Sequence, residues 1–193
     1  MTNQKTFYAT LVALFIFASF PFLKHLLPIL NHAWAPTLFF AFSVCVIMAT
    51  QHISPKSIGL HAKGFLKNVV LGLALGLLGL ILFYFLQKVI INEKILVQRM
   101  GLEPMGLSWV LPVLAVPLCE EVFFRGLLLS SLKSKFPLAK SIFISAILFT
   151  LVHSQNYLGA FTLGLAGAII TQKTKSLIPT IVLHMCGNAY PLI

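Results

Sequence analysis

Long apolar runs, separated by short polar breaks, dominate this sequence and leave few architectures open to it. A helix that crosses the hydrocarbon core of a bilayer needs about 20 predominantly apolar residues. Such runs occur at about seven places, and because the fifth and sixth are short, six to eight spans are expected. The sequence therefore predicts an all-α fold, a polytopic transmembrane helical bundle. The approximate limits of the runs are 7–23, 34–51, 64–91, 107–132, 140–154, 157–171 and 176–193.

Composition excludes the ordinary soluble classes of protein. Apolar residues make up 59% of the 193 residues and charged residues 9%, whereas soluble domains have about 45–50% and 25%. The formal charge is +10, but the basic residues are dispersed between apolar runs, so nucleic-acid binding is not expected. The three cysteines form no C-x-x-C pair and indicate neither a disulfide framework nor a zinc knuckle. We expect a single integral membrane domain over residues 1–193.

The distribution of basic residues predicts the orientation of the chain. Placing alternate loops on one side collects nine lysines there and leaves four basic residues opposite. By the positive-inside rule the N-terminus is cytoplasmic, and an odd number of spans puts the C-terminus outside. The first run lacks a small-residue cleavage site, which favours an uncleaved span over a signal peptide. We expect a multi-pass protein of a bacterial inner (plasma) membrane. The nine are Lys5, Lys56, Lys63, Lys67, Lys133, Lys135, Lys140, Lys173 and Lys175, and the four are Lys24, Lys88, Lys94 and Arg99.

Small residues recur at helical spacing in two of the predicted spans. Such spacing lets the backbones of neighbouring helices approach closely. We interpret both sets as packing positions within one chain, in preference to a dimer interface, and the oligomeric state is left open. The first set is Gly72, Gly76 and Gly79, and the second is Ala160, Gly164 and Ala168.

The fourth apolar run contains three charged residues near its middle, Glu120, Glu121 and Arg125. Each would cost about 2.5–3.5 kcal/mol at the centre of a spanning helix, or roughly 8–10 kcal/mol together if none were paired or protonated. On a helix, Glu121 and Arg125 lie about 40° apart, whereas Glu120 and Arg125 lie about 140° apart. We therefore predict an ion pair between Glu121 and Arg125. Glu120 is expected to be buried, unpaired within its own helix and suited to act as a general base. An ion pair that only fixes helix packing is the alternative.

Two further polar sites interrupt apolar runs, namely His153, and His184 with Asn188. His184 and Asn188 are four residues apart and share one helix face. Glu120 and His153 each lie 13 residues from a lysine on the same side, about 20 Å of helix, so they are expected at similar depth. The four groups can converge if their spans are neighbours. Two prolines that precede the glutamates, and that should kink the helix or open its hydrogen bonding, are Pro112 and Pro117.

Three short motifs occur in order on successive apolar segments, and together they resemble a known family. The family is that of the CAAX-processing and bacteriocin-processing (CPBP) membrane proteases, also called the type II CAAX prenyl endopeptidase or Ras-converting-enzyme-like group. The resemblance covers about residues 107–193, which we expect to be the catalytic core spans, while the spans of residues 1–106 carry no motif. The motifs are Glu120-Glu121-Val-Phe-Phe-Arg125, Phe149-x-x-x-His153 and His184-x-x-x-Asn188.

The resemblance implies an intramembrane endopeptidase that cleaves a membrane-associated protein or peptide, such as a prenylated CAAX protein or a bacteriocin precursor. It makes Glu120 the base that activates water with the help of His153, while His184 and Asn188 stabilise the oxyanion and Glu121 and Arg125 support the site. The residues agree with these roles, because amide hydrolysis needs an activated water molecule and donors aimed at the developing negative charge.

A metal mechanism stays open, because members of the family have also been described as metalloproteases. Glu120, His153 and His184 could hold zinc with one coordination position open. Glu121 would then have to be the base, and its expected pairing with Arg125 argues against this. We therefore favour a metal-free mechanism with no cofactor, and zinc is the alternative.

Two other classes of function also stay open. Buried Glu, Arg and His side chains are what a proton-coupled transporter uses, but the first three spans contain almost no ionisable residue at depth. A non-enzymatic membrane binding or immunity protein could keep the same fold. The intact set of proposed catalytic residues favours the enzyme over both.

Overall fold

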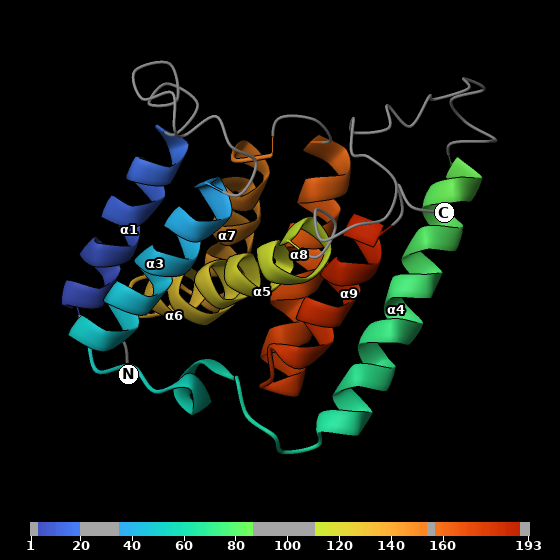
Figure 1. Ribbon diagram of the computed structural model, residues 1–193, viewed down its shortest axis with the longest axis horizontal. Coiled ribbons are helices and arrows are strands. Elements are labelled where there is room, and N and C mark those ends of the chain that lie inside the picture. The colour runs from blue at the N-terminus through green and yellow to red at the C-terminus, as the bar shows by residue number, and fades with distance from the viewer. Residues whose placement is uncertain (1–3, 20–34, 87–110, 154–156, 190–193) are drawn as a thin grey trace.

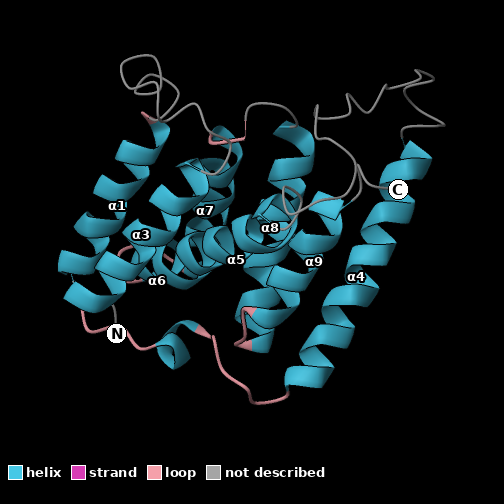
Figure 2. Cartoon of the chain, in the orientation of Figure 1, coloured by secondary structure: helices cyan, strands magenta, loops and turns pink. Residues whose placement is uncertain are grey.

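The computed structural model describes residues 4–19, 35–86, 111–153 and 157–189. Every regular element within these ranges is helical and none is a strand, so the prediction of an all-α chain is confirmed (Figures 1 and 2). The elements are α1 (Gln4–Ala18), α3 (Ala35–Thr50), the 3₁₀ turn η2 (Pro55–Ile58), α4 (Phe65–Leu86), the π-helical η5 (Leu111–Ala115), α5 (Val116–Glu121), the π-helical η6 (Val122–Leu128), α6 (Leu129–Lys133), α7 (Leu138–Leu151), α8 (Tyr157–Thr174) and α9 (Ile178–Ala189).

Each of the seven predicted runs contains a helix, and the fourth run corresponds to the consecutive segments η5, α5, η6 and α6. By length and composition, one helix among the described residues could cross a membrane, at Phe65–Phe85 in α4. The apolar helices at Phe40–Thr50 and Leu138–Leu151 are shorter. The number of membrane spans therefore stays a prediction. The cysteines are free, as predicted.

The segment from η5 to α6 forms the centre of the fold. It runs across α1 and α3 at a steep angle (Figure 1), and α1, α3, α7, α8 and α9 all pack against it. Residues 121–129 are all buried. Phe123, Phe124 and Phe149 form a chain of edge-to-face aromatic contacts, with ring centroids 5.1 and 5.0 Å apart. Charged residues in the middle of this segment are therefore held inside the core.

Proline explains the first irregularity of the central segment. In the π-helical pattern of η5, the carbonyl of Pro112 would accept a hydrogen bond from residue 117, which is also proline and has no N–H. The two prolines thus coincide with an irregular, π-helical start of the central segment. The second π-helical stretch, η6, follows α5 without a proline of its own, and nothing in its local sequence explains it.

Close helix packing occurs where small residues predicted it, with one exception. A Cβ on Gly72 would lie 2.7 Å from the Pro179 carbonyl oxygen, and one on Gly76 would lie 2.7 Å from the Cys186 Sγ, so α4 packs tightly along α9. In α8, a Cβ on Gly164 would lie 3.2 Å from the Cα of Ala146 in α7. The prediction for Gly79 is wrong, because no described atom lies within 4 Å of its Cβ position.

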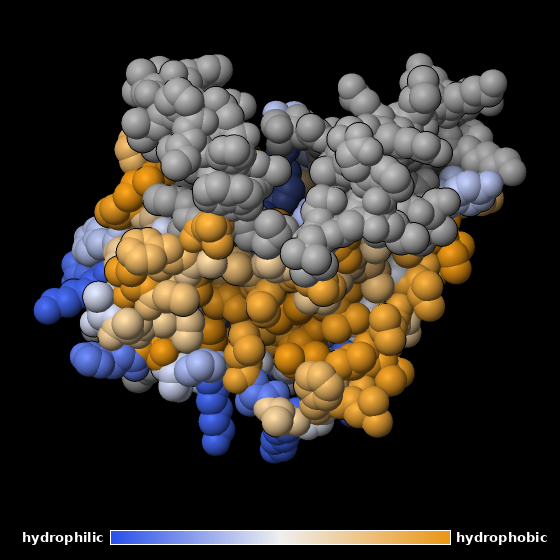
Figure 3. All heavy atoms as spheres, viewed as in Figure 1, coloured by the Kyte–Doolittle hydropathy of each residue, from blue (hydrophilic) through white to orange (hydrophobic). Residues whose placement is uncertain are grey.

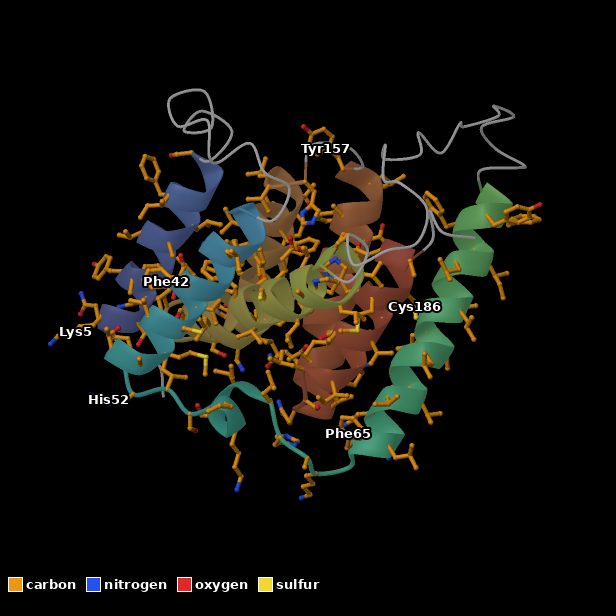
Figure 4. The ribbon with its side chains drawn as sticks, viewed as in Figure 1. Lys5, Phe42, His52, Phe65, Tyr157 and Cys186 are labelled. Carbon is orange, nitrogen blue, oxygen red and sulfur yellow. The ribbon has the colours of Figure 1, made fainter. Side chains whose placement is uncertain are left out.

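The outer faces of the helices are apolar, whereas one end of the molecule is basic (Figure 3). Large apolar side chains are exposed on α1, α3, α4, α7 and α8. Lys5, His52 and Phe65 lie at the basic end, and Tyr157 lies at the opposite end (Figure 4). A single cavity is lined by four of the nine lysines that the sequence predicts on one side of the membrane. The four basic residues predicted opposite lie outside the described residues.

Substitution of Gly72 by alanine tests the contact between α4 and α9. The added methyl group would overlap the Pro179 carbonyl oxygen and Val182, and such overpacking costs about 1–3 kcal/mol. We expect Gly72→Ala to lower the thermal stability of the purified protein. Gly79→Ala is the matched control on the same helix and should leave stability unchanged or slightly raised. Equal losses in both variants would contradict the packing.

Candidate active site

Three predicted catalytic side chains, Glu120, His153 and His184, come together in the structure. Oε2 of Glu120 lies 3.4 Å from Nε2 of His153 and 3.7 Å from Nε2 of His184. Glu120 belongs to α5, His153 follows the end of α7, and His184 belongs to α9. One potential ligand atom from each residue lies within 4.8 Å of the others. The predicted convergence is therefore confirmed for these three residues, and their depth in a membrane stays a prediction.

Glu121 faces away from this cluster and pairs with Arg125, as the helical geometry predicts. Nη1 of Arg125 lies 3.1 Å from Oε1 of Glu121, and both side chains are only 1% exposed. The guanidinium carbon lies 4.1 Å from the centre of the Phe149 ring, a cation–π contact, and Nη2 donates to the carbonyl oxygen of Leu163. Gly167 closes the other side, since a Cβ there would lie 3.1 Å from Nε of Arg125. The arginine is thus held from several directions.

The tautomer of His184 follows from its contact with Glu121. Nδ1 of His184 lies 3.0 Å from Oε1 of Glu121 in a buried hydrogen bond. Arg125 favours the ionised form of Glu121, and an ionised carboxylate can only accept a hydrogen bond. Nδ1 must therefore carry the proton and donate it. In the neutral imidazole, Nε2 is then an unprotonated acceptor that faces Glu120.

His153 is constrained in the same way by a backbone carbonyl. Its Nδ1 lies 2.6 Å from the carbonyl oxygen of Phe149, which has no proton to give, so Nδ1 donates. The Nε2 of neutral His153 is therefore also an acceptor that faces Oε2 of Glu120. No hydrogen-bond donor among the described residues reaches that oxygen, which is itself buried. The cluster presents three acceptor atoms to one another and is suited to hold a proton, a water molecule or a metal ion.

Asn188, the fourth predicted catalytic residue, lies beside the cluster and has a different contact. Its Nδ2 donates to the carbonyl oxygen of Pro112 at 2.8 Å. The side chain of Asn188 in α9 thus provides a donor to a backbone carbonyl of η5. The amide keeps a second N–H for another acceptor. Asn188 therefore joins α9 to the helix that carries the glutamates.

Phe149, which the sequence identifies only as part of a motif, lies at the structural centre of the site. Its ring lies 4.2 Å from the His153 ring and 5.7 Å from the His184 ring, measured between centroids, and it also underlies the guanidinium of Arg125. The sequence does not predict a role for Gly167, because that role depends on its close contact with Arg125. The only sequence feature that points to Gly167 is its helical spacing from other small residues of α8.

Comparison with known proteins identifies the region that contains this site. Residues 103–190 match the family described as type II CAAX prenyl endopeptidase Rce1-like. The matched range includes all six residues predicted for the site and agrees with the family that the three motifs indicated. No curated protein and no solved structure matches the chain.

Removal of the arginine should destabilise the whole fold. Arg125→Met leaves Glu121 as a buried charge without its partner, and breaking a buried ion pair on one side costs about 3–5 kcal/mol. We expect a strong loss of thermal stability and of purified yield. In the double variant Glu121→Gln/Arg125→Met both charges are removed, and the loss should be smaller. A single variant as stable as the unaltered protein would show that the pair contributes little.

Proposed function

We propose that this protein hydrolyses a peptide bond in a membrane-associated protein or peptide, because residues 103–190 match the type II CAAX prenyl endopeptidase Rce1-like family. The observation that carries the proposal is the cluster in which the Glu120 carboxylate lies within 3.4 and 3.7 Å of two imidazoles. A partly buried carboxylate without a protein donor is suited to take a proton from water.

In this mechanism Glu120 is the general base. A water molecule donates one hydrogen bond to the Glu120 carboxylate and another to Nε2 of His153, which directs its oxygen lone pair at the substrate carbonyl. As the carbon–oxygen bond forms, Glu120 takes the proton. The same proton passes to the leaving amine nitrogen when the carbon–nitrogen bond breaks, which regenerates the carboxylate.

His184 and Asn188 are the donors proposed for the oxyanion. His184 donates to Glu121 through Nδ1, so it can donate through Nε2 only as an imidazolium, and the Glu121 carboxylate stabilises that cation. Asn188 is held by Pro112 through one contact of its amide and supplies its remaining N–H. Donors oriented before the reaction stabilise the developing charge more effectively than water does.

Glu121 has a supporting role in this proposal. Its side chain is 1% exposed, and its Oε1 contacts both Arg125 and His184. A carboxylate that orients a histidine through Nδ1 fixes the tautomer and the direction of the ring. These contacts make Glu121 unsuited to be the base.

One observation favours zinc as a second candidate for the same site. Both imidazoles direct Nε2 at Glu120, an acceptor in the neutral ring, and both Nδ1 atoms are held by acceptors, an arrangement typical of metal-binding histidines. Glu120, His153 and His184 would hold the ion, which would polarise a carbonyl and lower the pKa of its bound water. The metal-free mechanism stays the preferred one, because among the described residues the only other carboxylate, Glu121, is engaged by Arg125 and His184.

We place the chain in a membrane as a single multi-pass domain over residues 1–193, with the catalytic core at 107–193. The apolar outer faces of five helices and the apolar length of α4 support this placement. The clustering of lysines at one end supports a cytoplasmic N-terminus in a bacterial plasma membrane. A proton-coupled transporter is less well supported, because the buried polar residues described in α1, α3 and α4 are Thr6, Thr10 and Asn68, none of which is ionisable.

Glu120→Gln tests the identity of the base. The neutral amide keeps the size of the side chain but cannot accept the proton, so cleavage should fall by roughly 10²–10⁴-fold while the thermal stability changes little. Cleavage of a quenched membrane-peptide library by the purified protein in liposomes measures the first quantity, and thermal unfolding measures the second. Turnover retained by this variant would refute the assignment of Glu120.

A strong chelator separates the two mechanisms. We expect turnover to resist the chelator, since the favoured mechanism needs no metal. The metal content of the purified protein gives a readout that does not depend on activity. Two results together would replace the metal-free mechanism with the zinc mechanism. The unaltered protein would contain one zinc ion per chain that His153→Asn lacks, and its activity would be lost on chelation and restored by added zinc.

A further inference from the structure

A cavity of about 660 Å³ opens at the lysine-rich end of the molecule. It lies between the loop that contains η2, the end of α6 and the end of α8. Its lining contains four lysines from separate parts of the chain, Lys56, Lys63, Lys133 and Lys175. Concentrating four ammonium groups around one cavity is electrostatically unfavourable unless an anion is bound there.

Backbone contacts hold the walls of this cavity together. The N–H of Leu177 donates to the carbonyl oxygen of Gly59 at 3.0 Å, and the ring of His61 donates through Nε2 to the carbonyl oxygen of Lys175 at 3.0 Å. Gly59 has a φ of 91°, and a Cβ there would lie 3.2 Å from the Lys175 carbonyl oxygen. The close approach of these two loops therefore requires glycine, and it brings their lysines to the same cavity.

Within the described part of the chain, no acidic group neutralises these lysines. No carboxylate is present in the cavity lining, and the only acidic residues in the described ranges are Glu120 and Glu121. Lys133 donates to the Gln172 side chain, which is neutral. Partial burial and the charge of Lys175 lower the pKa of Lys133 below its ordinary value.

Arg125 provides a second, independent indication of a ligand. Its side chain is 1% exposed but forms part of the cavity lining. Its Nε has no hydrogen-bond acceptor among the described residues, although Nη1 pairs with Glu121 and Nη2 donates to Leu163. A buried N–H without an acceptor carries a cost that a bound anion would remove.

We propose that this cavity binds the phosphate group of an anionic phospholipid. Arginine and lysine are the side chains that bind phosphate in proteins, and basic pockets on the cytoplasmic side of membrane helices bind anionic headgroups. The helices around the cavity expose apolar side chains on their outer faces, against which acyl chains can lie. This site lies apart from the peptide-hydrolysing cluster, and its occupancy does not depend on catalysis.

Two triple variants of equal charge test the proposal. One neutralises lysines of the cavity, and the other neutralises exposed lysines on the same side that are not part of its lining. Both are purified in detergent with an equimolar mixture of phosphatidylglycerol and phosphatidylcholine, and bound lipid is counted by native mass spectrometry. The cavity variant is Lys56→Gln/Lys63→Gln/Lys175→Gln, and the control is Lys5→Gln/Lys135→Gln/Lys173→Gln.

We expect the unaltered protein and the control to retain phosphatidylglycerol in preference to phosphatidylcholine, and to gain thermal stability when it is added. The cavity variant should bind it on the order of 100-fold more weakly, since each of the three lysines contributes about fivefold. Equal weakening in both triple variants would show binding to diffuse surface charge and would overturn the proposal. Equal retention of the two lipids would overturn it as well.

A titration with inorganic phosphate distinguishes the two sources of the anion. Phosphate that displaces the lipid only at concentrations far above that of the lipid supports a headgroup site. Phosphate that binds as tightly as the lipid, and loses this affinity in the cavity variant alone, would reassign the cavity to a soluble phosphate and overturn the choice of a lipid. Neither outcome depends on peptide hydrolysis, so the test is independent of the proposed protease activity.

Discussion

The ion pair between Glu121 and Arg125 determines much of the structure around it. Two charges inside an apolar core are tolerated when they are paired with each other. Phe149 lies under the guanidinium of this pair, and His184 donates a hydrogen bond to its carboxylate. Phe149 also holds His153 through its carbonyl oxygen. The positions of both imidazoles are therefore linked to the burial of one ion pair.

Two adjacent glutamates have opposite environments because successive residues on a helix point about 100° apart. Glu121 points into the core, where its Oε1 contacts Arg125 and His184, whereas Glu120 points at the imidazoles and its Oε2 has no donor among the described residues. The same helix thus provides one carboxylate that stabilises the core, Glu121, and one that is available to accept a proton, Glu120. Exchange of their roles would require a rotation that the buried residues 121–129 do not allow.

Local patterns in the sequence were sufficient to predict the helices, the Glu121–Arg125 pair and the meeting of Glu120 with both histidines. Each depends on helical spacing or on the order of motifs. The contact of Asn188 with Pro112, and that of Gly167 with Arg125, depend on how distant helices are placed and could not be read from spacing. Periodicity alone also gave Gly79 a packing role, although no described atom lies within 4 Å of its Cβ position.

Arg125 lies between the two functional regions of the molecule. It pairs with Glu121 on the side of the catalytic cluster, and it forms part of the lining of the lysine cavity. Because interactions between charges are strong where water is excluded, an anion in the cavity would compete with Glu121 for the same guanidinium. Glu121 in turn accepts the hydrogen bond that orients His184 through Nδ1. One ion pair therefore connects the lysine cavity to the position of a histidine in the proposed catalytic site.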